Sequence, residues 1–558
     1  MPLFSSRKDL TWLIEALKGI DSGSSDLDNR KDYPLYLFFL ALLLFFPALG
    51  LRDFWAPVEP RYAEIARVMF AKGEWIVPTV NGDLYTDKPI LYFWLVLIAS
   101  HLVGVVNEWT VRAPCALAGI GFVLATYLVG RDFFAARIGF IAAAVLATSV
   151  RVIWEARWAH VDMVFGLFFV FTIYFAARSL LRKDSPNAIL LAYVFMALAT
   201  LTKGLIGIVL PVLLFVGFMT VRRDWRLIVD ARMPYGIPIF LLVVVPWFYL
   251  VSSATDGRWL SDFIYVHHIQ RYTAGAGHRQ PFYYYFTTLP VDLLPWTIFA
   301  IPALFAYRSY REIWTQPVSL FFLMWFLVVF LFFSISDTKR DLYLLPLLPA
   351  GALFLANYLN DLVVDRLPQD PFYRGITLLF FCLVAISGLA LPIAAWWLRK
   401  EAFWFTLLPA VAITAGGIVV AGFVWQRKPV GVVTGTVLMM TIATLFAAVW
   451  IFPYLEEFKS RRPFSLEVGK IVPPETPLYI YADTMNDFNY YTKREVIPVV
   501  RSHSEVEKLV GQSQDGYLLI KDRDLKRLSP FAPGKVVATD SVGSTTWSLV
   551  HFKASDAS

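Results

Sequence analysis

Hydrophobic residues follow one another in long runs along most of this chain, and charged residues are concentrated between the runs. A membrane-spanning helix needs about 20 mostly apolar residues, because each residue advances the helix by about 1.5 Å. Many runs approach this length, so the pattern predicts a polytopic α-helical membrane protein. The apolar segments lie at about 34–52, 90–106, 113–130, 136–150, 160–181, 187–202, 205–220, 234–252, 290–306, 317–334, 343–359, 374–396, 404–425 and 430–451.

The apolar segments belong to a transmembrane region, residues 34–452, with a polar part on each side. Residues 1–33 are expected in the cytoplasm. From residue 453 onward, short alternating runs such as Leu478–Ala482 and Gly516–Lys521 replace the long apolar ones. Alternation over about four to eight residues is typical of half-buried strands. Residues 453–558 are therefore predicted to form a small soluble α/β domain.

Lysine and arginine residues gather in a few short loops, which predicts the orientation of the chain. Cytoplasmic loops of membrane proteins carry an excess of Lys and Arg. With the basic loops inside, the polar loops 53–89, 253–289 and 336–342 and the C-terminal domain lie outside. The basic loops are Arg182–Lys183, Arg222–Arg226, Tyr307–Arg311 and Arg427–Lys428.

The number of crossings follows from this orientation. With residues 1–33 inside and the loop 53–89 outside, segments 90–106, 113–130 and 136–150 must cross an even number of times. The short segment 90–106 is the one expected not to span, because a basic loop follows segment 113–130. The chain then has about thirteen transmembrane helices.

The composition agrees with this class of protein. Of the 558 residues, 58% are hydrophobic and 17% are charged, against about 45–50% and about 25% in soluble domains. The net charge of +7 reflects cytoplasmic Lys and Arg and does not indicate nucleic-acid binding. The two cysteines lie in apolar segments and predict neither a metal site nor a disulfide.

The first outer loop, residues 53–89, is rich in residues suited to chemistry. Pro60 favours the start of a short amphipathic helix, and Glu59 lies just before it. Glu59 suits either a helix cap or a catalytic carboxylate. Lys88 precedes an apolar segment, where its side chain either reaches the lipid headgroups or binds a phosphate together with Arg61.

Two charged residues lie at the ends of apolar segments on the same outer face. Asp162 opens one segment, where an acidic residue also stabilises the helix dipole. Lys203 lies between two closely spaced segments, where burying a lysine is costly unless it has a partner. Each residue therefore has a structural and a functional interpretation.

Two further clusters are predicted on this face. The pair His267–His268 lies in a polar loop, and such pairs are more often surface residues than metal ligands. Lys339, Arg340 and Tyr343 enter the next apolar segment and suit an anionic headgroup. Acids, bases and aromatic rings above a hydrophobic bundle together suit an amphiphilic substrate with an anionic head.

Several short motifs in order, between about residues 53 and 360, resemble the GT-C glycosyltransferases. Within that superfamily they resemble the bacterial transferases that add 4-amino-4-deoxy-L-arabinose to lipid A. Each motif is short, but their shared order is specific. The motifs are Glu-Pro-Arg-Tyr-Ala-Glu at 59–64, Gly-Glu-Trp-Ile-Val-Pro at 73–78, Asp-Lys-Pro at 87–89, Thr-Lys-Gly at 202–204, His-Ile-Gln-Arg at 268–271 and Tyr-Leu-Leu-Pro at 343–346.

The resemblance implies an enzyme of the bacterial cytoplasmic (inner) membrane, with its active site facing the periplasm. It would move the aminosugar from undecaprenyl phosphate to a lipid A phosphate. The added amine would lower the negative charge of lipid A and so weaken the binding of polymyxin and cationic peptides. A monomer is expected.

The resemblance also implies roles for single residues. Lys88, Arg61 and Tyr343 would hold the carrier phosphate, and Tyr62 and Tyr85 would line the site. The further basic residues of the outer face would also bind substrate. These are Lys203, Lys339 and Arg340.

The implied acids are Glu59 and Asp162, which with Lys88 form the catalytic set. Asp87 and His268 match the place where the family can hold a divalent ion, with zinc the expected metal. Two ligands alone make a weak site, because closed zinc sites have about four.

The chain departs from the family at one position, where Val58–Glu59 replaces the usual Asp-Glu. In related members that Asp is a candidate base for a hydroxyl acceptor. A lipid A phosphate is already anionic near neutral pH and needs no base. Alternatively, Asp53 or Glu59 stands in for the missing acid, or the activity differs.

Two other functions are consistent with parts of the pattern. One is a glycosyltransferase that uses another polyprenyl donor and a protein or polysaccharide hydroxyl, for which Glu59 or Asp162 would be essential. The other is a transporter of a lipid-linked sugar, which predicts internal repeats and broken helices near the membrane midplane. The sequence shows no inverted repeat, and its polar residues cluster at one face.

Overall fold

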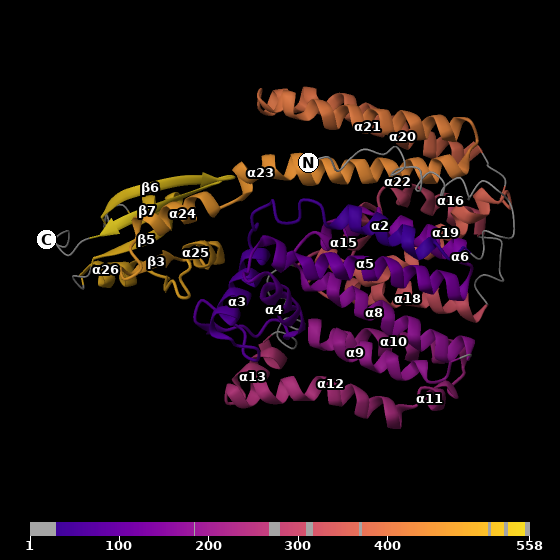
Figure 1. Cartoon of the computed structure of the whole chain (residues 1–558), viewed down its shortest axis with the longest axis horizontal. Helices are drawn as coiled ribbons and strands as arrows, with labels where there is room; N and C mark the ends of the chain where they lie inside the picture. Colours follow the sequence, from indigo (N-terminus) through magenta and orange to yellow (C-terminus); the bar gives the residue numbers. More distant parts are fainter. Residues whose placement is uncertain are drawn as a thin grey trace.

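The computed structural model describes residues 30–183, 185–266, 279–307, 316–367, 371–511, 515–528 and 534–552. Within them it contains a large helical bundle and a smaller α/β unit that projects from one end of the bundle (Figure 1). Most bundle helices run roughly parallel or antiparallel to one another.

Each predicted apolar segment lies largely in helical structure. A helix satisfies the backbone hydrogen bonds within its own segment, which a lipid environment requires. The main helices are α2 (Tyr33–Phe45), α4 (Leu91–Val103), α5 (Glu108–Phe133), α6 (Ala136–Ala147), α7 (Val150–Ala156), α8 (Val161–Ala177), α9 (Ala188–Lys203), α10 (Ile206–Arg222), α12 (Met233–Ala254), α15 (Tyr284–Asp292), α16 (Ala300–Tyr307), α18 (Pro317–Ile335), α19 (Leu348–Val363), α20 (Pro371–Leu398), α21 (Ala402–Trp425) and α22 (Pro429–Phe446). Shorter turns join or extend them: η2 (Arg178–Arg182), α11 (Leu227–Asp230), α13 (Arg258–Ile264), η4 (Trp296–Phe299), η5 (Asp341–Leu347), η6 (Ala447–Ile451) and α23 (Phe452–Lys459).

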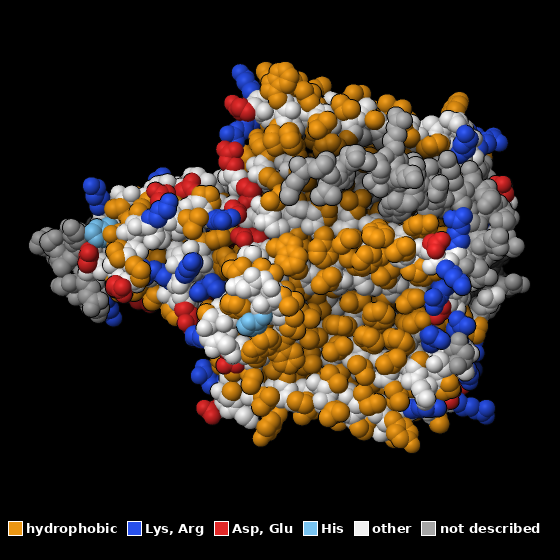
Figure 2. All heavy atoms as spheres, viewed as in Figure 1, with side chains coloured by type: hydrophobic (Ala, Val, Ile, Leu, Met, Phe, Trp, Pro, Cys, Tyr) orange, Lys and Arg blue, Asp and Glu red, His pale blue; other side chains and the backbone are white. Residues whose placement is uncertain are grey.

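The bundle has the surface of a membrane protein. Among the described residues, 8 helices are long and apolar enough to cross a membrane, or up to 10 if each of two bent pairs is one span. Four shorter apolar helices accompany them: α2, α4, α9 and α10. On the face in Figure 2, hydrophobic side chains cover the bundle between two ends where charged side chains gather.

Two helical spans are bent, and the bends lie against each other. The angle between α6 and α7 is 67°, and the angle between α15 and the helix that follows it is 108°. The backbone N–H of Val150 donates to the carbonyl of Leu294 at 3.1 Å. The indole N–H of Trp296 donates to the hydroxyl of Thr148 at 3.0 Å. Groups freed by one bend therefore bind groups at the other.

The first outer loop folds at the end of the bundle that carries the α/β unit (Figure 1). It contains the predicted amphipathic helix, α3 (Val58–Lys72), followed by an antiparallel hairpin of β1 (Thr79–Val80) and β2 (Asp83–Leu84). Gly73 ends α3 in the left-handed conformation, with φ 65°, which glycine adopts without a steric penalty.

The α/β unit contains a five-stranded mixed sheet with the order β4-β3-β5-β7-β6. β3 pairs in parallel with β4 and β5, and β7 is antiparallel to β5 and β6. Phe464, Phe488 and Trp547 pack in its core. Its elements are α24 (Arg462–Ile471), β3 (Leu478–Tyr481), α25 (Asn486–Thr492), β4 (Val499–Val500), α26 (His503–Gly511), β5 (Gly516–Lys521), α27 (Asp522–Leu528), β6 (Lys535–Val542) and β7 (Thr545–Phe552).

A continuous helical stretch, Pro429–Lys459, connects the bundle to the α/β unit. It passes the predicted domain boundary at residue 453, because η6 and α23 prolong α22. Helix α24 of the α/β unit then starts at Arg462.

Candidate functional site

Glu59, at the start of α3, is completely buried in a dense set of hydrogen bonds. Arg52 donates to its carboxylate at 2.7 and 2.9 Å, and Arg112 donates at 2.8 and 2.9 Å. The backbone N–H groups of Trp55 and Ala159 donate at 3.2 and 3.1 Å. Burial by itself would raise the pKa of Glu59, but Arg112 and Arg52 lower it well below its ordinary value. Glu59 is therefore held as a carboxylate.

These contacts bear on the catalytic role predicted for Glu59. A general base needs a lone pair within reach of the proton that it removes. Both oxygens of Glu59 already accept hydrogen bonds, and its side chain has no exposed surface. The geometry favours a positioning role, in which Glu59 joins α3 to α5 and to the segment after α7.

Asp53, the other acid considered near Val58, points elsewhere. Its carboxylate accepts hydrogen bonds from Ser460 at 2.7 Å and from Arg462 at 2.8 Å. Its backbone N–H donates to Glu456 at 3.2 Å. Asp53 therefore ties the first outer loop to the start of the α/β unit, and its contacts give no support to a role as substitute base.

Tyr62 of α3 lies close to Tyr85, Asp87 and Lys88, which follow the β1–β2 hairpin. The two tyrosine rings are buried, with centroids 6.3 Å apart. The Tyr85 hydroxyl donates to Asp87 at 3.5 Å, and the Lys88 ammonium donates to the other Asp87 oxygen at 3.2 Å. The indole N–H of Trp259 donates to the Tyr85 carbonyl at 2.8 Å, which fixes the backbone here.

Asp162 and Lys203 form a buried ion pair beside this group. The Lys203 ammonium lies 2.5 Å from the Asp162 carboxylate, and their side chains are 8% and 9% exposed. The ammonium also lies 4.7 Å from the Tyr343 ring centroid and 5.0 Å from the Phe165 ring centroid. Burial, and then the charges of Asp87 and Asp162, raise the pKa of the Tyr62 hydroxyl, so both acids act on one tyrosine.

Two arginines add positive charge without being neutralised. The side chains of Arg61 and Arg340 form no hydrogen bond or ion pair with any residue that the structure describes. The charge of Arg340 acts on both Asp162 and Lys203, and the charge of Lys88 acts on Lys203. We call Arg61, Lys88, Lys203 and Arg340 the cation cluster. It brings together residues from four separate segments of the sequence.

Lys339 was predicted to bind substrate, but the structure gives its ammonium other partners. The side chain is buried, with 4% of the residue exposed, and donates to the carbonyls of Gln280 at 3.1 Å and of Ser336. The backbone N–H of Gln280 also donates to the Asp337 carbonyl at 3.3 Å. Lys339 therefore connects the outer loop 336–342 to the outer loop 253–289, and these contacts favour a structural role.

A charged network centred on Arg151 was not predicted. Arg151 donates to Asp292 at 2.8 Å and to Asp341 at 2.6 Å, and lies 3.3 Å from Glu155. Glu155 in turn contacts a ring nitrogen of His160 at 2.8 Å. The only sequence signal is an arginine and a glutamate four residues apart next to an apolar run. The network holds α7, α15 and η5 beside the cation cluster.

The predicted metal site consists of Asp87 and His268. His268 lies outside the described residues, and Asp87 carries the Lys88 ammonium on one oxygen. Among the described residues, no group of three or more His, Cys, Asp or Glu side chains could hold a metal ion. The described donors therefore do not make a zinc site by themselves. The metal stays a prediction.

The chain is similar to known proteins along most of its length. Residues 87–250 match the family described as dolichyl-phosphate-mannose-protein mannosyltransferase. The chain is 30% identical over 516 residues to the undecaprenyl phosphate-alpha-4-amino-4-deoxy-L-arabinose arabinosyl transferase of Shewanella sediminis, with 91% of each chain covered. The transferase of the same name from Pseudomonas paraeruginosa is 30% identical over 420 residues, with 72% of this chain and 73% of that chain covered.

Solved structures extend the similarity to the fold. The crystal structure of ArnT from Cupriavidus metallidurans bound to undecaprenyl phosphate matches with a TM-score of 0.77 at 26% identity, over 95% of this chain and 100% of that chain. The Archaeoglobus fulgidus oligosaccharyltransferase in the apo form matches with a TM-score of 0.51 at 12% identity, over 88% and 70% of the chains. The second match concerns the fold alone.

Proposed function

This chain belongs to the family of undecaprenyl phosphate-α-4-amino-4-deoxy-L-arabinose arabinosyl transferases, and we propose that it transfers the aminosugar from undecaprenyl phosphate to a phosphate of lipid A. It is a multi-pass membrane glycosyltransferase with the helical GT-C fold. The proposed product is a lipid A that carries a cationic amine, which weakens the binding of polymyxin and cationic peptides.

The cation cluster is the observation that carries this proposal. Lys88 and Lys203 each contact one carboxylate, Asp87 and Asp162, whereas Arg61 and Arg340 add two unneutralised charges. An excess of positive charge close to buried tyrosines suits a phosphate attached to a hydrophobic carrier. We assign the carrier phosphate to Lys88, Arg61 and Arg340, with Tyr62 and Tyr85 beside the sugar.

The proposed reaction is a direct displacement at the sugar. An oxygen of the acceptor phosphate forms a bond to the anomeric carbon as the bond from that carbon to the carrier phosphate oxygen breaks. The electron pair of the broken bond stays on undecaprenyl phosphate, which leaves with an additional negative charge. Preorganised cations lower the energy of this developing charge. The cation cluster is therefore proposed to stabilise the leaving group.

The proposed acceptor explains why a base is dispensable at Val58. A phosphate monoester has its second pKa near 6, so it is largely dianionic at neutral pH. A hydroxyl acceptor would instead need a carboxylate with a free oxygen. Glu59 and Asp53 are both hydrogen-bonded to cationic side chains, and Asp162 is paired with Lys203. The contacts of Glu59 and Asp53 favour the phosphate acceptor over a protein or polysaccharide hydroxyl, whereas Asp162 pairs with Lys203 through Oδ1 alone.

We place the cation cluster on the periplasmic side, with thirteen transmembrane helices and the α/β unit soluble in the periplasm. Helix α4, at the end of the bundle, is the apolar helix proposed not to span. Its 13 residues extend over only about 20 Å, which is also the length of α2, so the choice of α4 rests on the positions of the basic loops. The basic loops then lie at the opposite, cytoplasmic end. The enzyme is proposed to act as a monomer.

Replacing Lys88 tests the proposal directly. Cells that carry Lys88→Ala as their only copy should lose the added aminopentose from lipid A, with a rate reduction of about 10²- to 10³-fold. Mass spectrometry of lipid A measures the product. Lys183→Ala, which changes an exposed lysine that is 66% accessible, is the matched control. Unchanged lipid A modification by the Lys88→Ala enzyme would contradict the assignment, and sugar on proteins instead would support a hydroxyl acceptor.

A further inference from the structure

A cavity of about 200 Å³ lies between the segment after α2, helix α7 and the stretch from α22 to α23. None of the residues of the cation cluster lines it. Small-molecule sites usually measure about 300–1,000 Å³. The lining is mostly hydrophobic, so the cavity suits part of a lipid better than a compact polar molecule.

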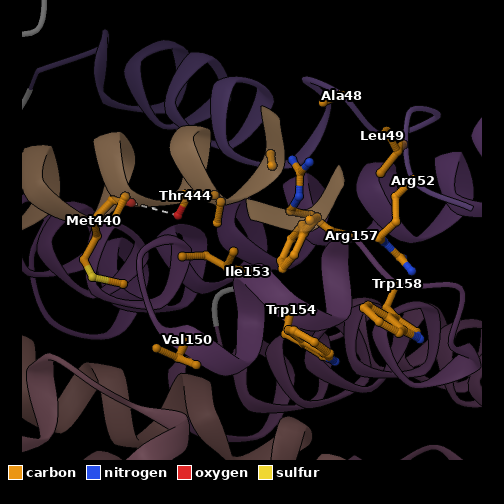
Figure 3. A pocket seen from close by; sticks show the side chains of 14 residues that line it. Ala48, Leu49, Arg52, Val150, Ile153, Trp154, Arg157, Trp158, Met440 and Thr444 are labelled. Carbon is orange, nitrogen blue, oxygen red and sulfur yellow. Dashed lines mark hydrogen bonds between the residues drawn. The ribbon is translucent and has the colours of Figure 1, made fainter. Parts of the chain in front are cut away.

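The cavity has a polar and an apolar end. Figure 3 shows Arg157 and Trp158 toward one end, with Met440 and Val150 toward the other. The indole rings of Trp154 and Trp158 stack with centroids 4.4 Å apart. Tryptophan and arginine are frequent at the headgroup level of a bilayer, where an apolar body and a polar group are both accommodated.

The direction of α22 agrees with this polarity. Met440 lies twelve residues before Phe452 along the continuous helical stretch, so the two are roughly 18 Å apart along its axis. Phe452 lies toward the α/β unit, next to Trp154, with ring centroids 6.1 Å apart. Trp154 is 36% exposed and Val150 is 40% exposed, which gives the cavity an accessible apolar rim. A lipid headgroup would lie near Trp154, and its chain would run toward Met440.

Arg157 brings an uncompensated positive charge to the polar end. It is 6% exposed and donates to the backbone carbonyls of Leu44 at 2.8 Å and Pro47 at 2.7 Å. It forms no ion pair with any described residue. Burial, and then the like charges of Arg52 and Arg112, lower the pKa of Arg157 to about 10. Arg52 and Arg112 share the Glu59 carboxylate, whereas Arg157 contacts only neutral carbonyls, so an anion at this end would offset the charge of Arg157.

We propose that this cavity binds one bilayer glycerophospholipid with an anionic headgroup. Its phosphate lies near Arg157 and the indole N–H groups of Trp154 and Trp158, and one acyl chain lies along Ile153 and Ala443. The charge of Arg157 selects an anionic lipid over a zwitterionic one. This site is separate from the cation cluster, and the lipid bound there is not consumed in the reaction.

Native mass spectrometry of the full chain in a neutral detergent tests the proposal. The probes are phosphatidylglycerol, phosphatidylcholine of the same acyl chains, and undecaprenyl phosphate. The wild type should bind phosphatidylglycerol about fivefold more tightly than phosphatidylcholine, as expected for one arginine beside a headgroup with a net negative charge instead of a neutral one. Ala443→Phe fills the cavity and should remove this preferred binding. Ile442→Phe, on the exposed side of the same helix, is the matched control and should retain it.

Two further results decide the assignment. Arg157→Gln should bind phosphatidylglycerol and phosphatidylcholine with equal affinity, provided that its gel-filtration profile matches that of the wild type. Lys88→Ala should leave the preference unchanged. The proposal is overturned if Ala443→Phe keeps the fivefold preference, or if undecaprenyl phosphate displaces phosphatidylglycerol one for one. The second result would assign the cavity to the carrier lipid.

Discussion

Two charged regions lie around α3, and they use the same residue types for different purposes. At the start of the helix, Glu59 is enclosed by Arg52 and Arg112, and its carboxylate is fully engaged. In the cation cluster, Arg61 and Arg340 remain unneutralised by the described residues. The first region has its counterion built in, whereas the second leaves charge available for an anion from outside. Whether the hydrogen bonds of a charged group are complete therefore separates structural from functional charge here.

The largest effect is expected at the enclosed carboxylate. Glu59→Gln leaves Arg52 and Arg112 buried without their counterion, which should destabilise the fold by about 3–5 kcal/mol. Thermal unfolding of the purified protein in detergent measures the change. Asp83→Asn, in the same outer loop but exposed, is the control. Wild-type unfolding combined with lost transfer would instead make Glu59 a catalytic residue.

A substitution in the cation cluster should have the opposite effect, lowering the transfer rate and leaving stability unchanged. Arg340→Ala removes a charge that is proposed to stabilise the leaving phosphate, so the transfer rate should fall about 10²- to 10³-fold. Its unfolding temperature should stay close to that of the wild type, because the side chain has no described partner. A rate assay with purified lipids and a melting curve are needed together. Arg366→Ala, which changes a side chain that is 71% exposed, should change neither.

Asp487 in α25 is intermediate between the two regions, because its carboxylate is buried but only partly hydrogen-bonded. One oxygen has no hydrogen-bond partner and the other lies 3.5 Å from Arg461. Burial raises the pKa of Asp487 to about 6, from an ordinary value of 3.8. Between these two pH values the unfolded chain has released the proton while the folded chain retains it. Stability should therefore fall as the pH rises through this window, by up to about 3 kcal/mol.

Asp487→Asn tests this pH dependence. The variant should lose the part of the slope between about pH 4 and pH 6 that belongs to this group. Unfolding of the full chain by denaturant at several pH values measures it. Glu475→Gln, at an exposed site in the same unit, should keep the wild-type slope. An unchanged slope in Asp487→Asn would show that Asp487 is already ionised when folded.

The smallest effect is expected at an exposed pair. Lys72 at the end of α3 contacts Glu495 of the α/β unit, and their side chains are 53% and 40% exposed. Exposed pairs contribute about 0.2–1 kcal/mol and weaken as salt is added. Lys72→Ala should therefore lower stability by less than about 1 kcal/mol in low salt, with no difference in 1 M salt. A larger loss would mean that this pair holds the α/β unit in place.

The helices of the bundle could be predicted because a helix in contact with lipid must consist mostly of apolar residues. A segment such as Met233–Ala254 must be apolar over its length, whatever it packs against. The strands at Leu478–Tyr481 and Gly516–Lys521 could be predicted from the short alternating runs of hydrophobic and polar residues. The bends after α6 and α15 were not predicted, because they depend on hydrogen bonds between distant segments.

The site could be predicted as a set of residues, but the state of each residue could not. Lys88, Lys203 and Arg340 were placed together because topology puts their segments at one face. The two arginine partners of Glu59 are 7 and 53 residues away in sequence, so no local pattern predicts them. The contacts of Lys339 with backbone carbonyls depend in the same way on the folded chain.

The length of the helical stretch Pro429–Lys459 sets the distance and the rotation between the bundle and the α/β unit. An α-helix turns by about 100° and advances by about 1.5 Å for each residue. A single inserted or deleted residue would therefore swing the α/β unit around the helix axis and separate Arg462 from Asp53. The π-helical turn η6, Ala447–Ile451, has hydrogen bonds that span one residue more than those of an α-helix, so deleting one residue there would restore α-helical geometry. A one-residue deletion should therefore be tolerated at η6 and should disturb the α/β unit elsewhere along this helical stretch.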